Sequence, residues 1–177
     1  SPGLKLLSLL RKDQGGKLPL VAEDLGVITD QVEHLRNYFA LPGMKILQFA
    51  FDGNLKNPYL PENIKGNNWI VYTGTHDNPT TLGWWNELDY ELKSKISERF
   101  SKDVNLPVWQ LIDMGLATDA KLFVAPIQDL LSLDNTSRFN QPGTVEGNWS
   151  WRLTSFDSHL GKALAQYSDL GKSHERL

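Results

Sequence analysis

From Leu18 to Gly26 the chain reads Leu-Pro-Leu-Val-Ala-Glu-Asp-Leu-Gly, an apolar run that ends in two adjacent carboxylates and a glycine. We interpret the apolar part as a buried strand. Ionisable groups at the end of such a strand cost free energy unless they pair, face water or take part in chemistry. In parallel α/β barrels, catalytic side chains lie at the carboxyl ends of the strands. The pattern therefore predicts a parallel α/β fold and makes Glu23 and Asp24 candidate site residues.

A second stretch repeats this pattern. From Trp69 to Asn78 the chain reads Trp-Ile-Val-Tyr-Thr-Gly-Thr-His-Asp-Asn, so an apolar run again leads into an acid, here Asp77 beside His76. Two strands that each end in an acid favour a site built for acid/base work on a polar substrate.

The rest of the chain alternates between strand and helix patterns. Strands are predicted up to Glu23, over 44–51, over 69–72 and over 121–126. Helices are predicted from the spacing of apolar residues, and they carry Leu6, Leu7 and Leu10; Val32, Leu35 and Phe39 after an N-cap at Thr29; Trp85, Leu88, Leu92, Ile96 and Phe100; residues 108–116; and Phe156, Leu160, Leu164 and Tyr167. The segments 52–68 and 135–151 are rich in Asn, Pro and Gly or otherwise polar and are predicted as loops. Four strand–helix units of this kind are half of an eight-stranded barrel.

Composition limits the function class only broadly. The 177 residues are 40% hydrophobic and 22% charged, which is typical of a soluble globular domain. A net charge of −3 gives no sign of nucleic-acid binding, and the absence of cysteine excludes disulfides and thiolate metal sites. No apolar run approaches the roughly 20 residues of a membrane helix, and no signal peptide is visible, so we expect a cytoplasmic protein. Because the chain begins at Ser1, we expect a processed or truncated polypeptide.

Several blocks of sequence closely resemble the amylomaltases, the family of 4-alpha-glucanotransferases or disproportionating enzymes. The blocks are residues 22–29, 41–49, 72–78, 137–143 and 147–149, which read AEDLGVIT, LPGMKILQF, YTGTHDN, SRFNQPG and GNW. They occur in the order of the family and span nearly the whole chain. The resemblance implies a (β/α)₈ TIM barrel of the alpha-amylase type. Residues 1–177 would form its C-terminal half, strands 5 to 8, with the N-terminal half absent.

The resemblance assigns catalytic roles to two carboxylates. Glu23 matches the general acid/base, which protonates the leaving glycosidic oxygen and then activates the acceptor. Asp77 matches the carboxylate that stabilises the oxocarbenium-like transition state. A retaining reaction also needs a nucleophilic carboxylate about 5–5.5 Å from the acid.

Four further residues match substrate-binding positions of the family. His76 matches a histidine that hydrogen-bonds the distorted sugar, Asn140 lies in the loop on the acceptor side, and Phe49 matches an aromatic residue near the bond that is cut. Asp24 is predicted to belong to the same polar shell. No metal and no cofactor are expected.

The nucleophile of the family is missing from this sequence. In the family it is an aspartate two residues after an arginine, at the end of the fourth strand. Arg36, Arg99 and Arg138 have no aspartate at that spacing, and Arg11 has Asp13 only on a helix-to-turn stretch. We therefore expect two of three catalytic carboxylates here, and no turnover by the 177 residues alone.

Other interpretations remain open for single motifs. The acids at 23–24 are also typical of a helix N-terminus, and His76-Asp77 is compatible with a turn or a weak metal half-site. Trp149 and Trp151 are about equally suited to sugar stacking and to a purely structural role.

The predicted function is transfer of α-1,4-glucan segments between maltooligosaccharides in starch and carbohydrate metabolism. The partners would be a maltooligosaccharide or starch-derived donor and acceptor, with no nucleic acid and no membrane. The alternative is a non-catalytic glucan-binding half-barrel that needs its N-terminal part, and hydrolysis is the enzymatic rival. A half-barrel exposes strand edges, so we also expect self-association or a larger assembly.

Overall fold

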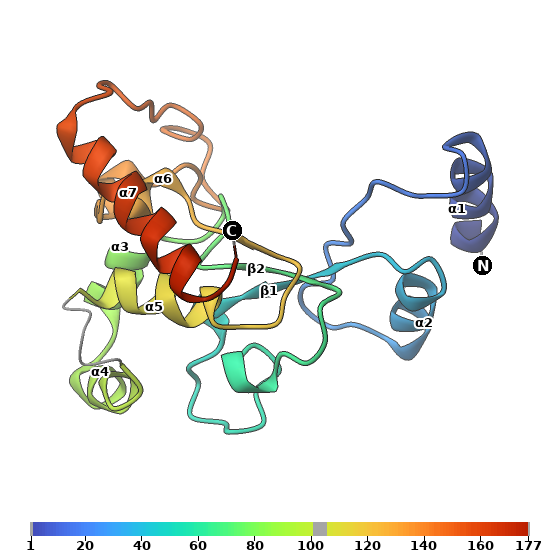
Figure 1. Ribbon diagram of the computed structural model, residues 1–177, viewed down its shortest axis with the longest axis horizontal. Coiled ribbons are helices and arrows are strands. Elements are labelled where there is room, and N and C mark those ends of the chain that lie inside the picture. The colour runs from blue at the N-terminus through green and yellow to red at the C-terminus, as the bar shows by residue number, and fades with distance from the viewer. Residues whose placement is uncertain (1, 101–105, 177) are drawn as a thin grey trace.

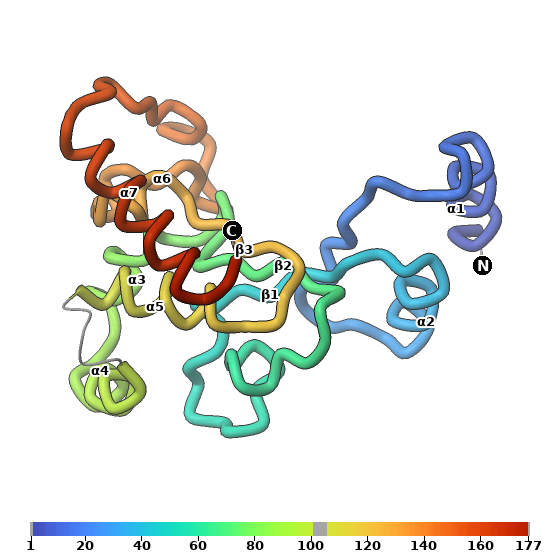
Figure 2. The backbone as a smooth tube through the Cα atoms, viewed as in Figure 1, coloured from blue at the N-terminus to red at the C-terminus, as the bar shows by residue number. Residues whose placement is uncertain are grey.

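A computed structural model of the chain describes residues 2–100 and 106–176 and shows an α/β arrangement (Figures 1 and 2). The strands are β1 (Gly43–Ile46), β2 (Trp69–Tyr72) and β3 (Leu122–Val124). The α-helices are α1 (Pro2–Asp13), α2 (Asp30–Tyr38), α3 (Thr81–Glu87), α4 (Tyr90–Ser97), α5 (Pro107–Leu116), α6 (Ile127–Leu130) and α7 (Ser158–Ser173). Three short 3₁₀ helices are η1 (Leu47–Phe49), η2 (Pro61–Asn63) and η3 (Asn135–Ser137).

The three strands form one parallel sheet in the order β1-β2-β3. Ile46 pairs with Tyr72, which in turn pairs with Val124. Every strand is therefore followed by a segment that leaves from the same edge of the sheet. This arrangement confirms the predicted parallel α/β class and places the segments after the strands beside one another.

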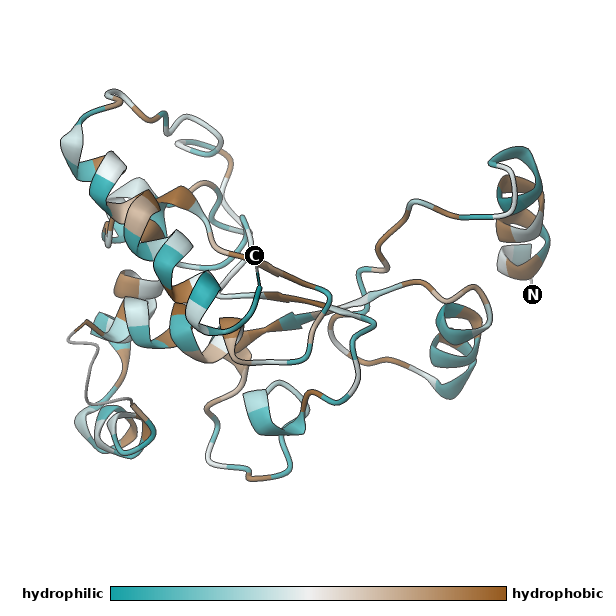
Figure 3. Cartoon of the chain, in the orientation of Figure 1, coloured by the Kyte–Doolittle hydropathy of each residue, from teal (hydrophilic) through white to brown (hydrophobic). Residues whose placement is uncertain are grey.

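The core lies between the sheet and α5. Leu47, Val71, Leu111 and Ile112 are completely buried there. α5 contacts α3, α6 and α7, and α7 lies across this group of helices in Figure 1. Figure 3 shows hydrophobic residues along much of the sheet and on parts of the helices around it. Burial of this apolar surface holds the strand ends, and hence the site, in place.

The predicted strand that ends at Glu23 is wrong, because residues 17–25 have no regular secondary structure. One backbone hydrogen bond, from the Ala22 N–H to the Pro42 carbonyl at 2.8 Å, joins this segment to the residue before β1. Pro19 has no N–H to donate, and Leu20 and Val21 are 42% and 45% exposed. With no second strand beside it in the described residues, the segment cannot build the repeated ladder that defines a strand.

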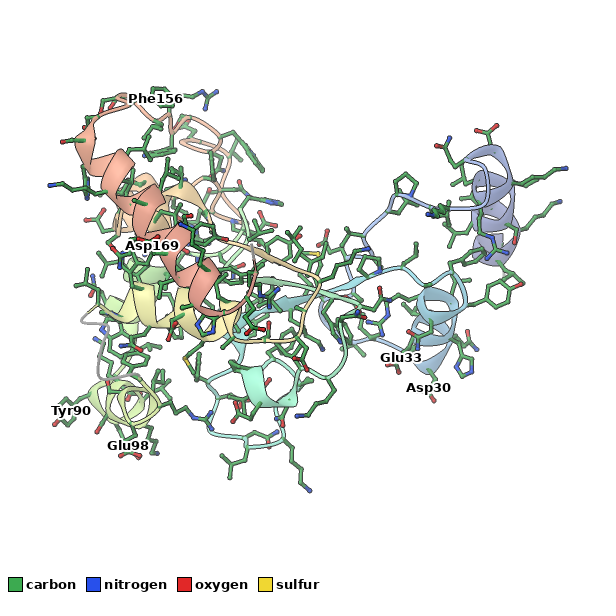
Figure 4. The ribbon with its side chains drawn as sticks, viewed as in Figure 1. Asp30, Glu33, Tyr90, Glu98, Phe156 and Asp169 are labelled. Atoms are coloured by element: carbon green, nitrogen blue, oxygen red, sulfur yellow. The ribbon has the colours of Figure 1, made fainter. Side chains whose placement is uncertain are left out.

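The predicted strand 69–72 is found with the same bounds as β2, and several other predicted elements are found with changed bounds. The predicted strand 44–51 is β1 followed by η1, and the strand 121–126 is reduced to β3. The predicted helix that carries Trp85 and Ile96 is two helices, because Leu88 is extended and the Asp89 carboxylate accepts a hydrogen bond from the Leu92 N–H at 2.7 Å, capping α4. Phe156 lies before α7 and is exposed at the outer edge of the molecule (Figure 4).

The N-terminal helices extend away from the sheet (Figure 1). α1 is a helix as predicted, but none of its residues is buried, and Leu6 and Leu10 face solvent. It contacts α2 through Arg11, whose guanidinium lies 5.3 Å from the centre of the Phe39 ring and 5.9 Å from that of Tyr38. Within the described residues, no helix is long and apolar enough to cross a membrane.

Candidate active site

A cleft of about 750 Å³ lies at the carboxyl edge of the sheet. It is formed by the segment after Ala22, by β1 and η1, by the end of β2 with the loop that follows it, and by β3. The residues that line it are Glu23, Leu25, Gly26, Met44, Phe49, Tyr72, Gly74, Thr75, His76, Asp77, Asn78, Val124 and Pro126. Four of the six predicted site residues are in this list. The burial of Tyr72 beneath the cleft raises the pKa of its hydroxyl.

The loop after β2, residues 74–80, has a fixed internal turn. The side-chain oxygen Oδ1 of Asn78 accepts hydrogen bonds from the backbone N–H and the hydroxyl of Thr75, both at 2.8 Å. A Cβ atom on Gly74 would lie 2.6 Å from the side-chain amide nitrogen of Gln48, so any other residue would displace that side chain. The sequence Gly-Thr-His-Asp-Asn therefore forms a tight turn that presents His76 and Asp77 to the cleft.

Asp77 is held by residues from a distant loop. Its Oδ1 accepts a hydrogen bond from Asn140 Nδ2 at 2.6 Å and lies 3.3 Å from His76 Nε2. Its main-chain carbonyl accepts a hydrogen bond from Arg138 Nη2 at 2.6 Å. The side chain is still 50% exposed, so a face of the carboxylate remains open. The structure thus brings three predicted residues, Asp77, His76 and Asn140, together.

Aromatic rings extend the site beyond His76. The Trp149 ring lies 5.1 Å from the imidazole of His76, and Phe139 lies 5.8 Å from Trp151 (centroid distances). Trp149 has a positive φ of 61°, and its N–H donates to the Phe139 carbonyl at 2.7 Å. Trp149 is exposed beside the cleft, whereas Trp151 is packed against Phe139.

Glu23 lines the cleft with an exposed side chain. No described residue pairs with its carboxylate. Phe49 contributes an exposed ring to the same cleft, and that ring is held edge-on by Tyr59 at a centroid distance of 5.6 Å. The carbonyl of Phe49 accepts a hydrogen bond from Asn57 Nδ2 at 2.8 Å, which fixes η1.

Asp24 does not line the cleft. Its Oδ2 forms an ion pair with Arg36, and its Oδ1 accepts a hydrogen bond from the Met44 N–H at 2.7 Å. Trp69 stacks on the other side of this pair, 4.3 Å from the guanidinium of Arg36, and Lys45 lies 4.2 Å from the same ring. Desolvation by burial lowers the pKa of Lys45, and the Asp24 charge opposes that effect. These contacts tie the segment before the cleft to β1 and α2.

Sequence reasoning missed Asp129, which belongs to α6 and is 1% exposed. Its carboxylate accepts hydrogen bonds from the Thr73 hydroxyl at 2.5 Å, the Thr81 hydroxyl at 2.7 Å and the Thr81 N–H at 2.8 Å. Desolvation raises the pKa of this carboxyl, and the three hydrogen bonds oppose that rise. The available signal was a single acid directly before Leu130 and Leu131, in the segment that follows the predicted strand 121–126.

Among the described residues, no group of three or more histidine, aspartate or glutamate side chains is placed to hold a metal ion. The residues that line the cleft include two carboxylates, an imidazole, an amide and aromatic rings.

Comparison with known proteins identifies the family. A sequence profile described as 4-alpha-glucanotransferase matches residues 1–158. The chain belongs to the 4-alpha-glucanotransferase family. It is 46% identical over 153 residues to the 4-alpha-glucanotransferase of Synechocystis sp.. This alignment covers 86% of this chain and 30% of the relative. It is 44% identical over 164 residues to a chloroplastic/amyloplastic 4-alpha-glucanotransferase of Arabidopsis thaliana, covering 89% of this chain and 28% of the relative.

A solved structure agrees with this assignment to the 4-alpha-glucanotransferases. The amylomaltase of Streptococcus agalactiae in complex with acarbose superimposes with a TM-score of 0.89 at 32% identity. The match covers 99% of this chain and 35% of the other. The chain thus spans about a third of the length of the relatives that it matches, and its arrangement of strands and helices is that of the corresponding part of an amylomaltase.

Proposed function

We propose that this chain forms the acid/base side of an α-1,4-glucan transferase active site. The observation that carries the proposal is that Glu23, Phe49, His76 and Asp77 line one cleft at the carboxyl edge of a parallel sheet. This cleft occurs in a chain that is 46% identical to a named 4-alpha-glucanotransferase. Aromatic faces and hydrogen-bonding groups around a cleft are what recognition of a sugar requires.

In the proposed reaction Glu23 moves the proton. A carboxylate outside these 177 residues would attack the anomeric carbon of the donor while Glu23 protonates the departing glycosidic oxygen. Glu23 would then take the proton of the acceptor's 4-hydroxyl as that oxygen displaces the enzyme carboxylate. Because two displacements occur at one carbon, the configuration is retained.

Asp77 has surroundings suited to charge stabilisation. The hydrogen bond from Asn140 and the nearby His76 orient its carboxylate, while its half-exposed face can meet the sugar. A preorganised negative charge beside the ring favours the positive charge that develops in the transition state. We assign His76 and Asn140 to the orientation of Asp77 and to sugar hydroxyls, Phe49 to contact near the reacting bond, and Asp24 to support of the segment that carries Glu23.

We further propose that the chain is the last part of a (β/α)₈ barrel and is inactive by itself. The exposed Leu20 and Val21 and the unburied face of α1 are the surfaces that other parts of such a barrel would cover. A glucan-binding half without turnover remains the second candidate for the isolated chain. It is favoured because the one Arg-x-Asp of the sequence, Arg11 to Asp13, lies on a helix and not at the end of a strand. The expected compartment is the cytoplasm, although the Arabidopsis thaliana relative is named as chloroplastic/amyloplastic.

The test replaces the matched segment of the Synechocystis sp. relative with this chain and incubates the chimaera with maltotriose. We expect glucose and longer oligosaccharides, with the number of glucosidic bonds conserved. Glu23→Gln should abolish transfer, whereas Glu91→Gln, an exposed acid on α4, should leave it unchanged. Loss of glucosidic bonds would show hydrolysis, and activity in the Glu23→Gln chimaera would overturn the assignment.

The isolated chain is assayed in parallel for turnover and for acarbose binding by calorimetry. Acarbose binding without turnover is the expected result. Turnover by the isolated chain would disprove the claim that a residue outside it is needed. Failure to bind acarbose in the chain and failure of transfer in the chimaera would together overturn the proposed function.

A further inference from the structure

Both ends of the loop that carries His76 and Asp77 are attached to one buried carboxylate. Thr73, directly after β2, leads into the loop, and Thr81, the first residue of α3, follows it. Asp129 Oδ2 accepts from both threonine hydroxyls, at 2.5 and 2.7 Å, and Oδ1 accepts from the Thr81 N–H at 2.8 Å. A single side chain on α6 thus closes the base of the seven-residue loop 74–80.

The burial of Asp129 requires an explanation. The side chain is 1% exposed, and no cation is among its hydrogen-bond partners. An unpaired buried carboxylate costs free energy, and an apolar residue of similar size would serve a core position better. The contribution of Asp129 is therefore its ability to accept several hydrogen bonds at once. All three donors belong to the two ends of one loop.

Neighbouring contacts restrain the same loop without reaching its tip. The side-chain oxygen of Asn135 accepts a hydrogen bond from the Thr80 N–H at 3.2 Å, and Gln48 Nε2 donates to the Pro79 carbonyl at 3.1 Å. Asp77 itself is held at the tip by Asn140 and Arg138. The tip is thus oriented by exposed contacts, whereas its base depends on buried ones.

We propose that Asp129 is a positioning residue that fixes the base of loop 74–80 and thereby sets where the Asp77 carboxylate stands in the cleft. The predicted effect on glucan binding rests on the proposed function, because Asp129 would change binding only by moving the loop and would not itself touch the glucan. The predicted effect on the rigidity of loop 74–80 does not rest on the proposed function, because that rigidity can be measured without a ligand.

The test uses this chain with Asp129→Leu, Thr73→Val and Thr81→Val. Each valine variant removes one donor and keeps the residue's shape, so at least one variant is expected to fold if the leucine variant does not. The matched control is Thr118→Val, which removes a buried threonine hydroxyl that donates to the Gly115 carbonyl at 2.8 Å, away from the loop. Amide hydrogen exchange in 74–80, exchange in β2 and α5, and acarbose affinity are measured for all.

We expect the loop variants to speed exchange in 74–80 about tenfold relative to β2 and α5, since a hydrogen bond to a charged group is worth about that factor. Acarbose affinity should fall by about the same factor, whereas Thr118→Val should change neither ratio. Amide exchange that rises equally in 74–80, β2 and α5 would show a merely structural role for Asp129 and overturn the inference. Unchanged acarbose affinity in the loop variants would also overturn it. If the unmodified chain binds no acarbose and the chimaera transfers no glucan, the proposed function fails, while the exchange ratio still decides the role of Asp129 in the loop.

Discussion

The residue next to the proposed acid can be separated from it by experiment. Asp24 is paired with Arg36 and accepts the Met44 N–H, and the two charged side chains are 8% and 9% exposed. The perturbation is Asp24→Asn, which keeps the size of the side chain and removes its charge. We expect the free energy of unfolding to fall while acarbose affinity stays unchanged.

The size of the effect follows from what each partner retains. Breaking a buried ion pair by removing one charge costs about 3–5 kcal/mol. The guanidinium of Arg36 keeps Asn37 Oδ1 at 3.1 Å, Glu33 Oε1 at 3.8 Å and the face of Trp69 at 4.3 Å. The asparagine oxygen can still accept from the Met44 N–H. We therefore expect a loss at the lower end, about 3 kcal/mol.

The assay is urea unfolding together with acarbose titration. Asp24→Asn is compared with Arg36→Met and with the double variant, and the double variant should lose less than the sum of the single losses, since no unpaired charge then remains. The control is Glu91→Gln, which breaks an exposed pair with Lys95 and should cost less than about 1 kcal/mol. Unchanged stability with lost acarbose affinity in Asp24→Asn would refute the reasoning and make Asp24 a substrate ligand.

Three further predictions concern packing, the site and pH. Gly115→Ala should destabilise the chain by about 1–3 kcal/mol in urea unfolding, because the new Cβ would lie 2.1 Å from a ring carbon of Phe123; a stabilised variant would contradict this. Asn140→Ala should weaken acarbose binding about tenfold through loss of its hydrogen bond to Asp77, without lowering the melting temperature, and unchanged affinity would contradict it. Burial raises the pKa of Asp129 in the folded state above its unfolded-state pKa of 3.8, so protonation of this carboxyl favours the folded state. That stabilisation is complete below pH 3.8 and is lost as the pH rises through the folded-state pKa. Relative to Asp129→Asn, the unmodified chain should therefore lose up to about 1.4 kcal/mol per pH unit in that window, and a pH-independent difference between the two would disprove it.

The local sequence pattern was sufficient to predict a strand where that strand is paired on both sides in the sheet. The run Trp69 to Tyr72 is bounded by Asn68 on one side and by Thr73-Gly74 on the other, and β2 has those bounds. The run Leu18 to Ala22 has similar residues and forms no strand. The difference lies in the neighbours, because β2 has a partner on each side, whereas the earlier run has one backbone hydrogen bond. Strand formation depends on pairing, which composition does not encode.

For the candidate site too, local sequence patterns predicted some residues but not those that come together only in the fold. His76 and Asp77 were predictable because they follow an apolar run, and Glu23 because it ends one. The bond between Asn140 and Asp77 spans 63 residues, and only the family resemblance placed Asn140 in the site. Asp129 was missed because acids were sought at strand ends, and this one lies in the short helix that follows β3.

The two carboxylates of the cleft differ in what surrounds them. The Asp77 carboxylate accepts a hydrogen bond from Asn140 and lies 3.3 Å from His76 on its own loop. Glu23 is exposed and, within the described residues, unpaired. General acid catalysis depends on a held proton and on exclusion of water from the reacting bond. In the proposed mechanism, the described residues would orient the charge-stabilising carboxylate, Asp77, whereas they leave the proposed acid, Glu23, open to solvent.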